Sequence, residues 1–108
     1  EKRKQLTQLD MMIAEFERMA GELDLQIAAE EKKAGITDVS HFAYPTFAKA
    51  ARQRRDNLRD SQADLKQQRE SAQALLDEAE AELAKAEALE MRDGRGREAE
   101  GGRAAAAG

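Results

Sequence analysis

Apolar residues recur along the first third of the chain at alternating spacings of three and four residues. They are Leu6, Leu9, Ile13, Phe16, Ala20, Leu23 and Ile27. This spacing is the heptad pattern of a helix that packs along a narrow apolar seam, with Leu6 at position a and Leu9 at position d. It predicts one helix over about residues 1–34. Gly35 follows at the place where a glycine commonly ends a helix.

A second seam is marked by an apolar residue at every seventh position. These residues are Ala51, Leu58, Leu65, Ala72, Ala79 and Ala86. Leu75 and Leu89 fall at the accompanying d positions, and Leu76 and Leu83 widen the apolar stripe. The pattern predicts a second helix over about residues 46–91. Residues 93–108 are rich in Gly and Ala and lack a seam, so we predict a disordered C-terminal tail.

Residues 35–46, with the sequence GITDVSHFAYPT, interrupt both patterns. They hold the only Pro, the only Tyr and the only His of the chain. Pro45 suits the first turn of a helix, where no backbone N–H is needed. We therefore predict an all-α fold in which residues 1–92 form a long antiparallel two-helix coiled-coil hairpin with an irregular turn segment at 35–46.

One register of the two helices fits the apolar positions. In an antiparallel pair the a positions of one helix face the d positions of the other, so Leu6 is placed opposite Leu75 and the paired residue numbers add to 81. The chain then reverses between residues 40 and 41, inside the turn segment. The same register puts three polar residues in the seam: Arg54 opposite Ile27, Ser61 opposite Ala20, and Gln68 opposite Ile13.

The charges agree with an antiparallel pairing. The e positions of the first helix are Asp10, Glu17, Asp24 and Glu31, and the facing edge of the second helix carries Arg55, Gln62 and Arg69. An exposed pair contributes only about 0.5 kcal/mol, so the pattern selects the register more than it stabilises the fold. We also predict an ion pair between Glu30 and Arg54.

The end of the second helix has no partner in this register. Leu83, Ala86 and Leu89 would face residues numbered below 1. We therefore expect either that the first helix extends upstream of Glu1 by roughly ten residues or more, at about 1.5 Å each, or that another chain covers this stretch.

Composition favours long helices over a globular core. Charged residues make up 37% of the chain, aromatic residues 4%, and Cys and Trp are absent. The net charge of −4 argues against a chain drawn as a whole to nucleic acid, and no apolar run is long enough to cross a bilayer. His41 stands alone and no Gly-rich phosphate loop is present. We therefore expect no metal, no cofactor and no enzymatic activity.

Two clusters are candidates for partner binding. The basic patch of Arg52, Arg54, Arg55 and Arg59 pairs within the hairpin in one interpretation and meets phosphates or an acidic protein in the other. The turn tip of His41, Phe42, Tyr44, Pro45 and Phe47 is either a small core that closes the hairpin or a docking tip. Met11 and Leu25 point outward at f positions, which suggests a third helix docking there.

Two segments resemble the flagellar export protein FliJ family of alphaproteobacteria. They are EKRKQLTQLDMMIAEFERMA at residues 1–20 and HFAYPTFAKAARQRRDNL at residues 41–58. The resemblance covers about residues 1–92, and HFAYPT followed by QRRDNL is its specific part, because heptad spacing does not demand it. Family members carry further helix before the position of Glu1, and the Gly/Ala-rich tail departs from the family pattern.

The resemblance implies a cytoplasmic component of the flagellar type III export apparatus, peripheral to the inner membrane and not inserted in it. Its implied partners are the export ATPase, the export gate membrane protein and the export chaperones. The family hairpin resembles the central stalk of rotary ATPases and couples the ATPase ring to the gate. The end of the hairpin remote from the turn would then face the ATPase, with Leu6, Leu75, Leu76, Leu83 and Leu89.

A generic coiled-coil scaffold unrelated to export is the alternative function. Nucleic-acid binding through the basic patch is a weaker one. Because many seam positions are Ala, the hairpin alone is expected to be only marginally stable. A homodimer or a third helix from a partner therefore stays open.

Overall fold

Two helices make up the regular structure of the described chain. The computed structural model describes the backbone of residues 1–107 and the side chains of residues 1–96. The helices are α1 (Lys2–Ala34) and α2 (Thr46–Ala107). The predicted all-α class and the extent of the first helix are confirmed. The chain forms two units, Glu1–Ala72 and Gln73–Gly108.

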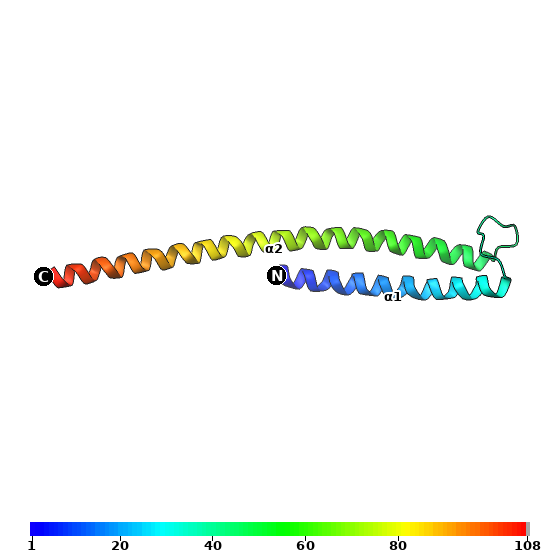
Figure 1. Cartoon of the computed structure of the whole chain (residues 1–108), viewed down its shortest axis with the longest axis horizontal. Coiled ribbons are helices and arrows are strands. Elements are labelled where there is room, and N and C mark those ends of the chain that lie inside the picture. The colour runs from blue at the N-terminus through cyan, green and yellow to red at the C-terminus, as the bar shows by residue number, and fades with distance from the viewer. Residues whose placement is uncertain (108) are drawn as a thin grey trace. The chain divides into compact units, whose positions relative to one another are not determined.

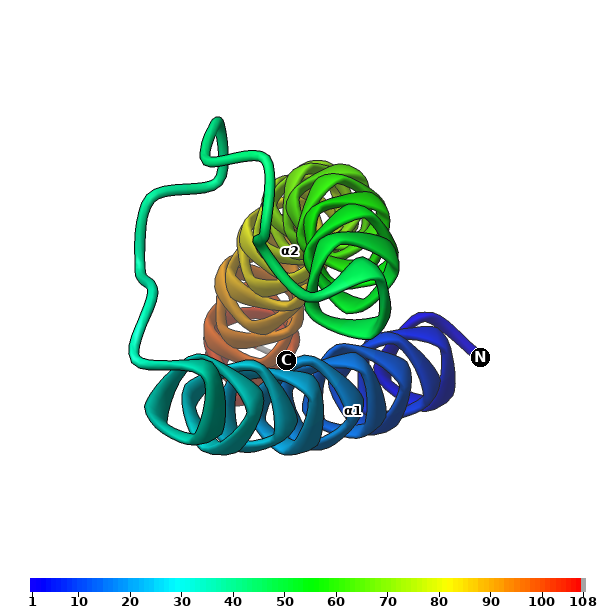
Figure 2. The same cartoon turned by 90° about the vertical axis from the view of Figure 1, so that its right-hand side faces the viewer.

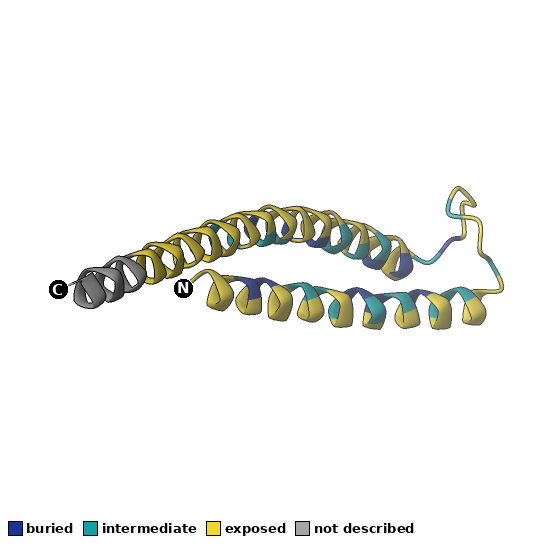
Figure 3. Cartoon of the chain, turned by 60° about the vertical axis from the view of Figure 1, so that its left-hand side comes forward, coloured by how far each residue is buried: buried dark blue, intermediate teal, exposed yellow. Residues whose placement is uncertain are grey.

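The first unit is a helical hairpin. α1 and the first part of α2 lie side by side and run in opposite directions (Figure 1). Viewed from the turn end, the connecting segment loops out to one side of the two helices (Figure 2). The buried residues of this unit lie on the faces that the helices turn toward each other (Figure 3). The predicted antiparallel hairpin is therefore confirmed.

Gly35 ends α1 as the sequence predicts. Its backbone is left-handed, with φ 69° and ψ 20°, and its N–H donates to the carbonyl of Glu31 at 2.9 Å. A side chain disfavours this conformation, which is why glycine occupies the position. Lys32 and Lys33 in the last turn of α1 also complement the negative end of the helix dipole.

Successive hydrogen-bonded turns carry the chain from α1 to α2. The N–H of His41 donates to the carbonyl of Asp38 at 3.1 Å, and the N–H of Tyr44 donates to the carbonyl of His41 at 3.0 Å. The carboxylate of Asp38 accepts from the hydroxyl and the N–H of Ser40, and these bonds lower the pKa of the Asp38 carboxyl. The carbonyl of Pro45 accepts the first helical hydrogen bond of α2, from Lys49 at 3.0 Å.

The seam of α2 differs from the predicted one. Ala51, Leu65 and Ala72 are buried as expected, but the second row of the seam comes four residues after each of the predicted a positions, not three. That row is Ala48, Arg55, Gln62 and Arg69, whereas the predicted seam residues Arg54, Ser61 and Gln68 are exposed. In this rotation of α2, Arg55 and Arg69 pair with Asp24 and Asp10 at the acidic edge of α1.

The predicted register holds in part. Ile27 clusters with Leu23 and Ala51, and Leu58, the predicted partner of Leu23, packs against the cluster. Asp10 meets Arg69 on the facing edges, as predicted. The predicted seam partners Arg54 of Ile27 and Leu75 of Leu6 are exposed, so the error is in the rotation of α2.

α2 also extends beyond its predicted end at about residue 91. It is helical to Ala107, so the prediction of a disordered tail over residues 93–108 is wrong up to that residue. Gly108 lies outside the described residues. Proline is absent after Pro45, and each glycine in a helix costs about 1 kcal/mol without forbidding it, while alanine has the highest helix propensity.

Candidate protein-docking site

A row of ion pairs closes one side of the hairpin. This ionic edge joins acids of α1 to arginines of α2: Asp10 to Arg69, Glu17 to Arg59, Asp24 to Arg55 and Arg59, and Glu31 to Arg52. Arg69 donates from Nε to Asp10 Oδ1 at 2.6 Å, and Arg55 donates from Nη1 to Asp24 Oδ1 at 3.0 Å. The pairing of Asp10 and Asp24 with arginines confirms the predicted charge matching.

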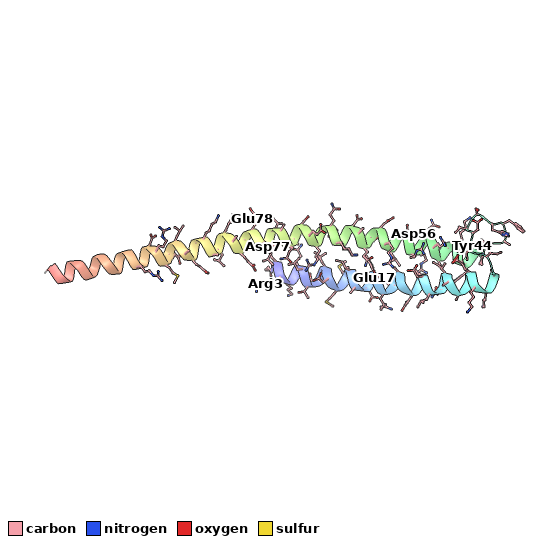
Figure 4. The ribbon with its side chains drawn as sticks, viewed as in Figure 1. Arg3, Glu17, Tyr44, Asp56, Asp77 and Glu78 are labelled. Carbon is pink, nitrogen blue, oxygen red and sulfur yellow. The ribbon has the colours of Figure 1, made fainter. Side chains whose placement is uncertain are left out.

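Gln62 occupies the middle of the ionic edge. It is only 4% exposed, and it is the buried polar residue of the described side chains. Its Nε2 donates to the backbone carbonyl of Ile13 at 3.2 Å and to the carboxylate of Glu17 at 2.9 Å. The bonds from Gln62 and then Arg59 lower the pKa of Glu17, which lies midway along α1 (Figure 4). The side chain of Gln62 thus links α2 to the backbone of α1 at one level of the hairpin.

Tyr44 closes the turn end of the ionic edge. It is 7% exposed, and its hydroxyl donates to Glu31 Oε2 at 3.2 Å and accepts from Arg52 Nε at 3.0 Å. The guanidinium of Arg52 also lies over the Tyr44 ring at 6.0 Å from its centroid, a distance at the limit of a cation–π contact. The interpretation of Tyr44 as part of a closing core is therefore confirmed.

The other residues of the turn tip differ in how far they are exposed. Pro45 is half-buried, whereas Phe42 is 96% exposed and Phe47 57% exposed. His41 is also exposed, and its ring stacks on Phe42 with centroids 4.8 Å apart. Exposing aromatic rings to water is unfavourable, so Phe42 and Phe47 are the residues of this tip that suit a docking role.

The basic patch is largely neutralised within the hairpin. Arg52, Arg55 and Arg59 form ion pairs with acids of α1, as the first of the two interpretations predicts. The predicted pair of Glu30 and Arg54 is wrong, because Glu31 and Arg52 pair instead and Arg54 forms no ion pair among the described side chains. Arg54 stands on the opposite side of the seam from the ionic edge.

A groove runs along that opposite side. It consists of three adjoining hollows of about 230, 150 and 90 Å³ that share residues of both helices. Its lining is Met19, Glu22, Leu23, Gln26, Phe47, Ala50, Ala51, Arg54, Asn57, Leu58 and Ser61. Each hollow is smaller than the cavities of about 300–1,000 Å³ that hold small ligands, so the groove suits side chains of a docking segment.

The groove and the turn tip form one candidate docking site. Phe47 belongs to both, because it is exposed at the tip and lines the end of the groove. Arg54 gives the groove one cation, and Met19 gives it an adaptable apolar side chain. A helix with apolar residues and one carboxylate directed at Arg54 would match this surface.

The leucines predicted for the terminal end differ in exposure. Leu6 is buried in the seam at 7% exposed, and Leu76 is half-buried. Leu75, Leu83 and Leu89 are 56%, 58% and 57% exposed. Leu6 therefore serves the hairpin core, and the exposed leucines are on the part of α2 from Gln73 onward. The outward positions predicted for Met11 and Leu25 are confirmed, at 69% and 74% exposed.

Two further features of the described residues bear on the kind of site. No group of three His, Cys, Asp or Glu side chains in this part of the chain gathers where it would hold a metal ion. Neither helix, over the residues described, has a stretch long and apolar enough to cross a bilayer.

Sequence reasoning placed Gln62 on the edge that faces Glu17, but it missed the groove, the burial of Gln62 and the bond from Gln62 to the Ile13 carbonyl. The groove depends on the rotation of α2, which the predicted register had wrong. A signal for Gln62 was present, because it stands at the same heptad position as Arg55 and Arg69 in a row that faces acids. No protein-family model, curated protein or solved structure matches the chain.

Proposed function

We propose that this chain is a protein-binding coiled-coil hairpin of the flagellar type III export apparatus. In this role it is a cytoplasmic coiled-coil stalk, peripheral to the inner membrane, that couples the export ATPase ring to the export gate and escorts export chaperones. The two segments that resemble the FliJ family support the assignment to flagellar export. The observation that supports a binding role is that the charged side chains of the ionic edge are paired within the hairpin, whereas large aromatic rings at the turn tip are exposed.

The paired arginines and the exposed rings decide which class of partner the surface of the hairpin can bind. Arg52, Arg55 and Arg59 are paired with acids, so they have little charge left for phosphates. Phe42 and Phe47, in contrast, expose large apolar rings. Aromatic side chains carry much of the energy of protein interfaces. The groove and the turn tip therefore suit a protein partner better than a nucleic acid.

The two units of the chain suit different partners. The turn tip and groove offer aromatic rings with one cation, and we assign them to the export gate. Leu83 and Leu89 are exposed on α2, and we assign them to the ATPase. Separate binding surfaces on the two units suit the coupling of a ring to a membrane gate.

Co-purification tests the proposal. The full chain is expected to retain the export ATPase and the cytoplasmic part of the gate protein. Leu83→Asp with Leu89→Asp should remove the ATPase alone, and Phe42→Ala with Phe47→Ala should remove the gate alone. Gln53→Asp, at an exposed position of α2, is the matched control. Retention of both partners by both double variants would refute the assignment.

A generic scaffold accounts for the same geometry without any link to export. Deletion of the gene distinguishes the two functions. Loss of motility and of secretion of flagellar proteins supports the export role, whereas normal motility and secretion support the scaffold.

A further inference from the structure

The groove beside Arg54 follows the two helices of the hairpin. Met19 and Gln26 line it from α1. Phe47, Arg54 and Ser61 line it from α2. On each helix these residues are seven positions apart, the spacing that keeps side chains along one side of a helix in a coiled coil. The groove therefore suits a third helix that lies alongside the other two.

The floor of the groove is apolar. Leu23 and Ala51 are buried residues of the core cluster, and both line the groove. Leu58 lies beside them and is half-buried, and Phe47 is 57% exposed at the turn end. An apolar side chain that enters the groove would extend this cluster and be removed from water, which favours binding.

Arg54 gives the groove a positive charge that the hairpin does not neutralise. It lines all three hollows and has no ion-pair partner among the described side chains. Glu22, the acid in the lining, accepts instead from Arg18 Nη1 at 2.7 Å. The row of α1 on this side of the seam holds no acid, since it consists of Met12, Met19, Gln26 and Lys33. Arg54 thus lacks the carboxylates that the ionic edge supplies to the other arginines.

From these features we infer that the groove binds an acidic amphipathic helix of a partner protein, with apolar side chains on the floor and a carboxylate at Arg54. A purely apolar helix would cover Arg54 and leave its charge without a partner, which is unfavourable. A basic helix would place like charges together. The ionic edge already uses the inferred combination, because Asp24 pairs with Arg55 at 3.0 Å beside the buried Leu23.

The chain's own helices lead away from the groove. Met19 is the first groove residue of α1 and lies seventeen residues after Lys2, so a helix continued upstream of Lys2 would start about 25 Å away. After Ser61, α2 stays helical to Ala107 and does not fold back. A symmetric dimer through this surface would bring two grooves together, and each Arg54 would again lack an acid. These arguments favour a different protein as the occupant.

The inference names the class of partner for the groove, and it rests on the proposed function only in treating the groove as a binding surface. The probe is a fluorescent synthetic helix of about three heptads with Leu at a and d and Glu at e and g, and its matched control carries Lys in place of Glu. Anisotropy titrations with the full chain measure both peptides. The Glu peptide should bind at least about tenfold more tightly than the Lys peptide, and its affinity should fall with added salt.

Four variants locate the binding. Arg54→Glu should reverse the preference, so that the Lys peptide binds more tightly. Lys49→Glu makes the same change of charge at an exposed position of α2 outside the groove lining and should keep the preference. Ala50→Trp fills the hollow that Ala50 lines and should weaken the Glu peptide by about tenfold. Ala63→Trp, at an exposed position outside the lining, should leave its affinity unchanged. Circular dichroism checks that each variant keeps its helix content.

Four results would overturn the inference. They are equal binding of the two peptides, a preference that survives Arg54→Glu, and loss of Glu-peptide binding in Leu83→Asp with Leu89→Asp, which would place the site beyond the hairpin. The fourth is a dimer of the free chain in light scattering that Ala50→Trp converts to a monomer, because the occupant is then a second copy.

Failure of the inference and failure of the proposed function give different results. A chain that binds neither peptide but retains the gate protein would overturn the inference alone. A chain that binds the Glu peptide at Arg54 but retains no gate protein would refute the proposed assignment and leave the inference standing.

Discussion

Arg69 and Asp10 pair across the hairpin although they stand 59 positions apart in the sequence. Two nitrogens of the guanidinium meet the two oxygens of the carboxylate, at 2.6 and 3.4 Å. The two side chains are 37% and 52% exposed, so solvent screens the attraction. The pair therefore contributes more to the choice of register than to the free energy of unfolding.

A charge swap tests this role. Asp10→Arg and Arg69→Asp should each lower the free energy of unfolding by about 0.5–1 kcal/mol, because each places like charges together. The double variant should recover most of the loss. Asp10→Arg with Lys49→Asp introduces the same charges at positions that do not meet, so its two effects should simply add. Urea unfolding measures these four variants and Lys49→Asp alone, and additive losses in the Asp10–Arg69 cycle would contradict a specific pair.

Gln62 is expected to matter more than the exposed ion pairs. Gln62→Ala removes a buried side chain with bonds to the Ile13 carbonyl and the Glu17 carboxylate. The free energy of unfolding should fall by about 1–3 kcal/mol. Gln67→Ala, one and a half turns away at an exposed position, should change it by less than about 0.5 kcal/mol. Equal effects of the two substitutions would show that Gln62 does not tie the helices together.

Glu17 makes the hairpin sensitive to acid. Its pKa in the folded chain lies below the ordinary 4.5, first because of Gln62 and then because of Arg59. A carboxyl whose folded pKa is depressed contributes stability that is present above the unfolded pKa. That contribution is lost as the pH falls below about 4.5 and through the folded pKa. In thermal unfolding scans between pH 7 and pH 3, Glu17→Gln should therefore lose less stability than the unsubstituted chain. An identical decline in both would contradict this account.

Tyr44 and Phe42 are expected to have different roles at the turn end: Tyr44 stabilises the hairpin, and Phe42 binds a partner. Tyr44→Phe keeps the buried ring and removes the hydroxyl between Glu31 and Arg52, so the free energy of unfolding should fall by about 1 kcal/mol. Phe42→Ala, at a ring that is 96% exposed, should leave it within about 0.5 kcal/mol. Chemical unfolding of both variants measures this difference. A large loss for Phe42→Ala would assign that ring to the core of the hairpin.

The features predictable from sequence were those with strong local signals. Gly35 after a heptad run and Pro45 before the next one located both ends of the turn segment, because each has a backbone preference that few positions satisfy. The acids of α1 and the arginines of α2 also identified the correct facing edges.

The rotation of α2 was harder to predict because its apolar signal is weak. Between residues 51 and 72 the seam has one apolar residue per heptad, and the candidates three and four residues later are both polar, as with Ser61 and Gln62. Placing Leu6 opposite Leu75 favoured the positions three residues later, whereas the structure uses those four residues later. The groove beside Arg54 follows from the true rotation, so it was beyond prediction from the sequence.

The same substitution should have opposite effects at Gly21, inside α1, and at Gly35, which ends α1. Gly21 lies inside the helix, and a Cβ added there meets nothing within 4 Å. Gly21→Ala should therefore raise the free energy of unfolding by about 0.5–1 kcal/mol, because alanine loses less backbone entropy on folding. Gly35 also has open space around it, but its φ of +69° is unfavourable for any residue with a Cβ. Gly35→Ala should lower the free energy of unfolding by about 1–2 kcal/mol. Thermal and urea unfolding of the two variants give the signs directly. If Gly35→Ala were neutral, the turn segment would accommodate another backbone conformation, and the chain reversal would not depend on the left-handed residue that ends α1.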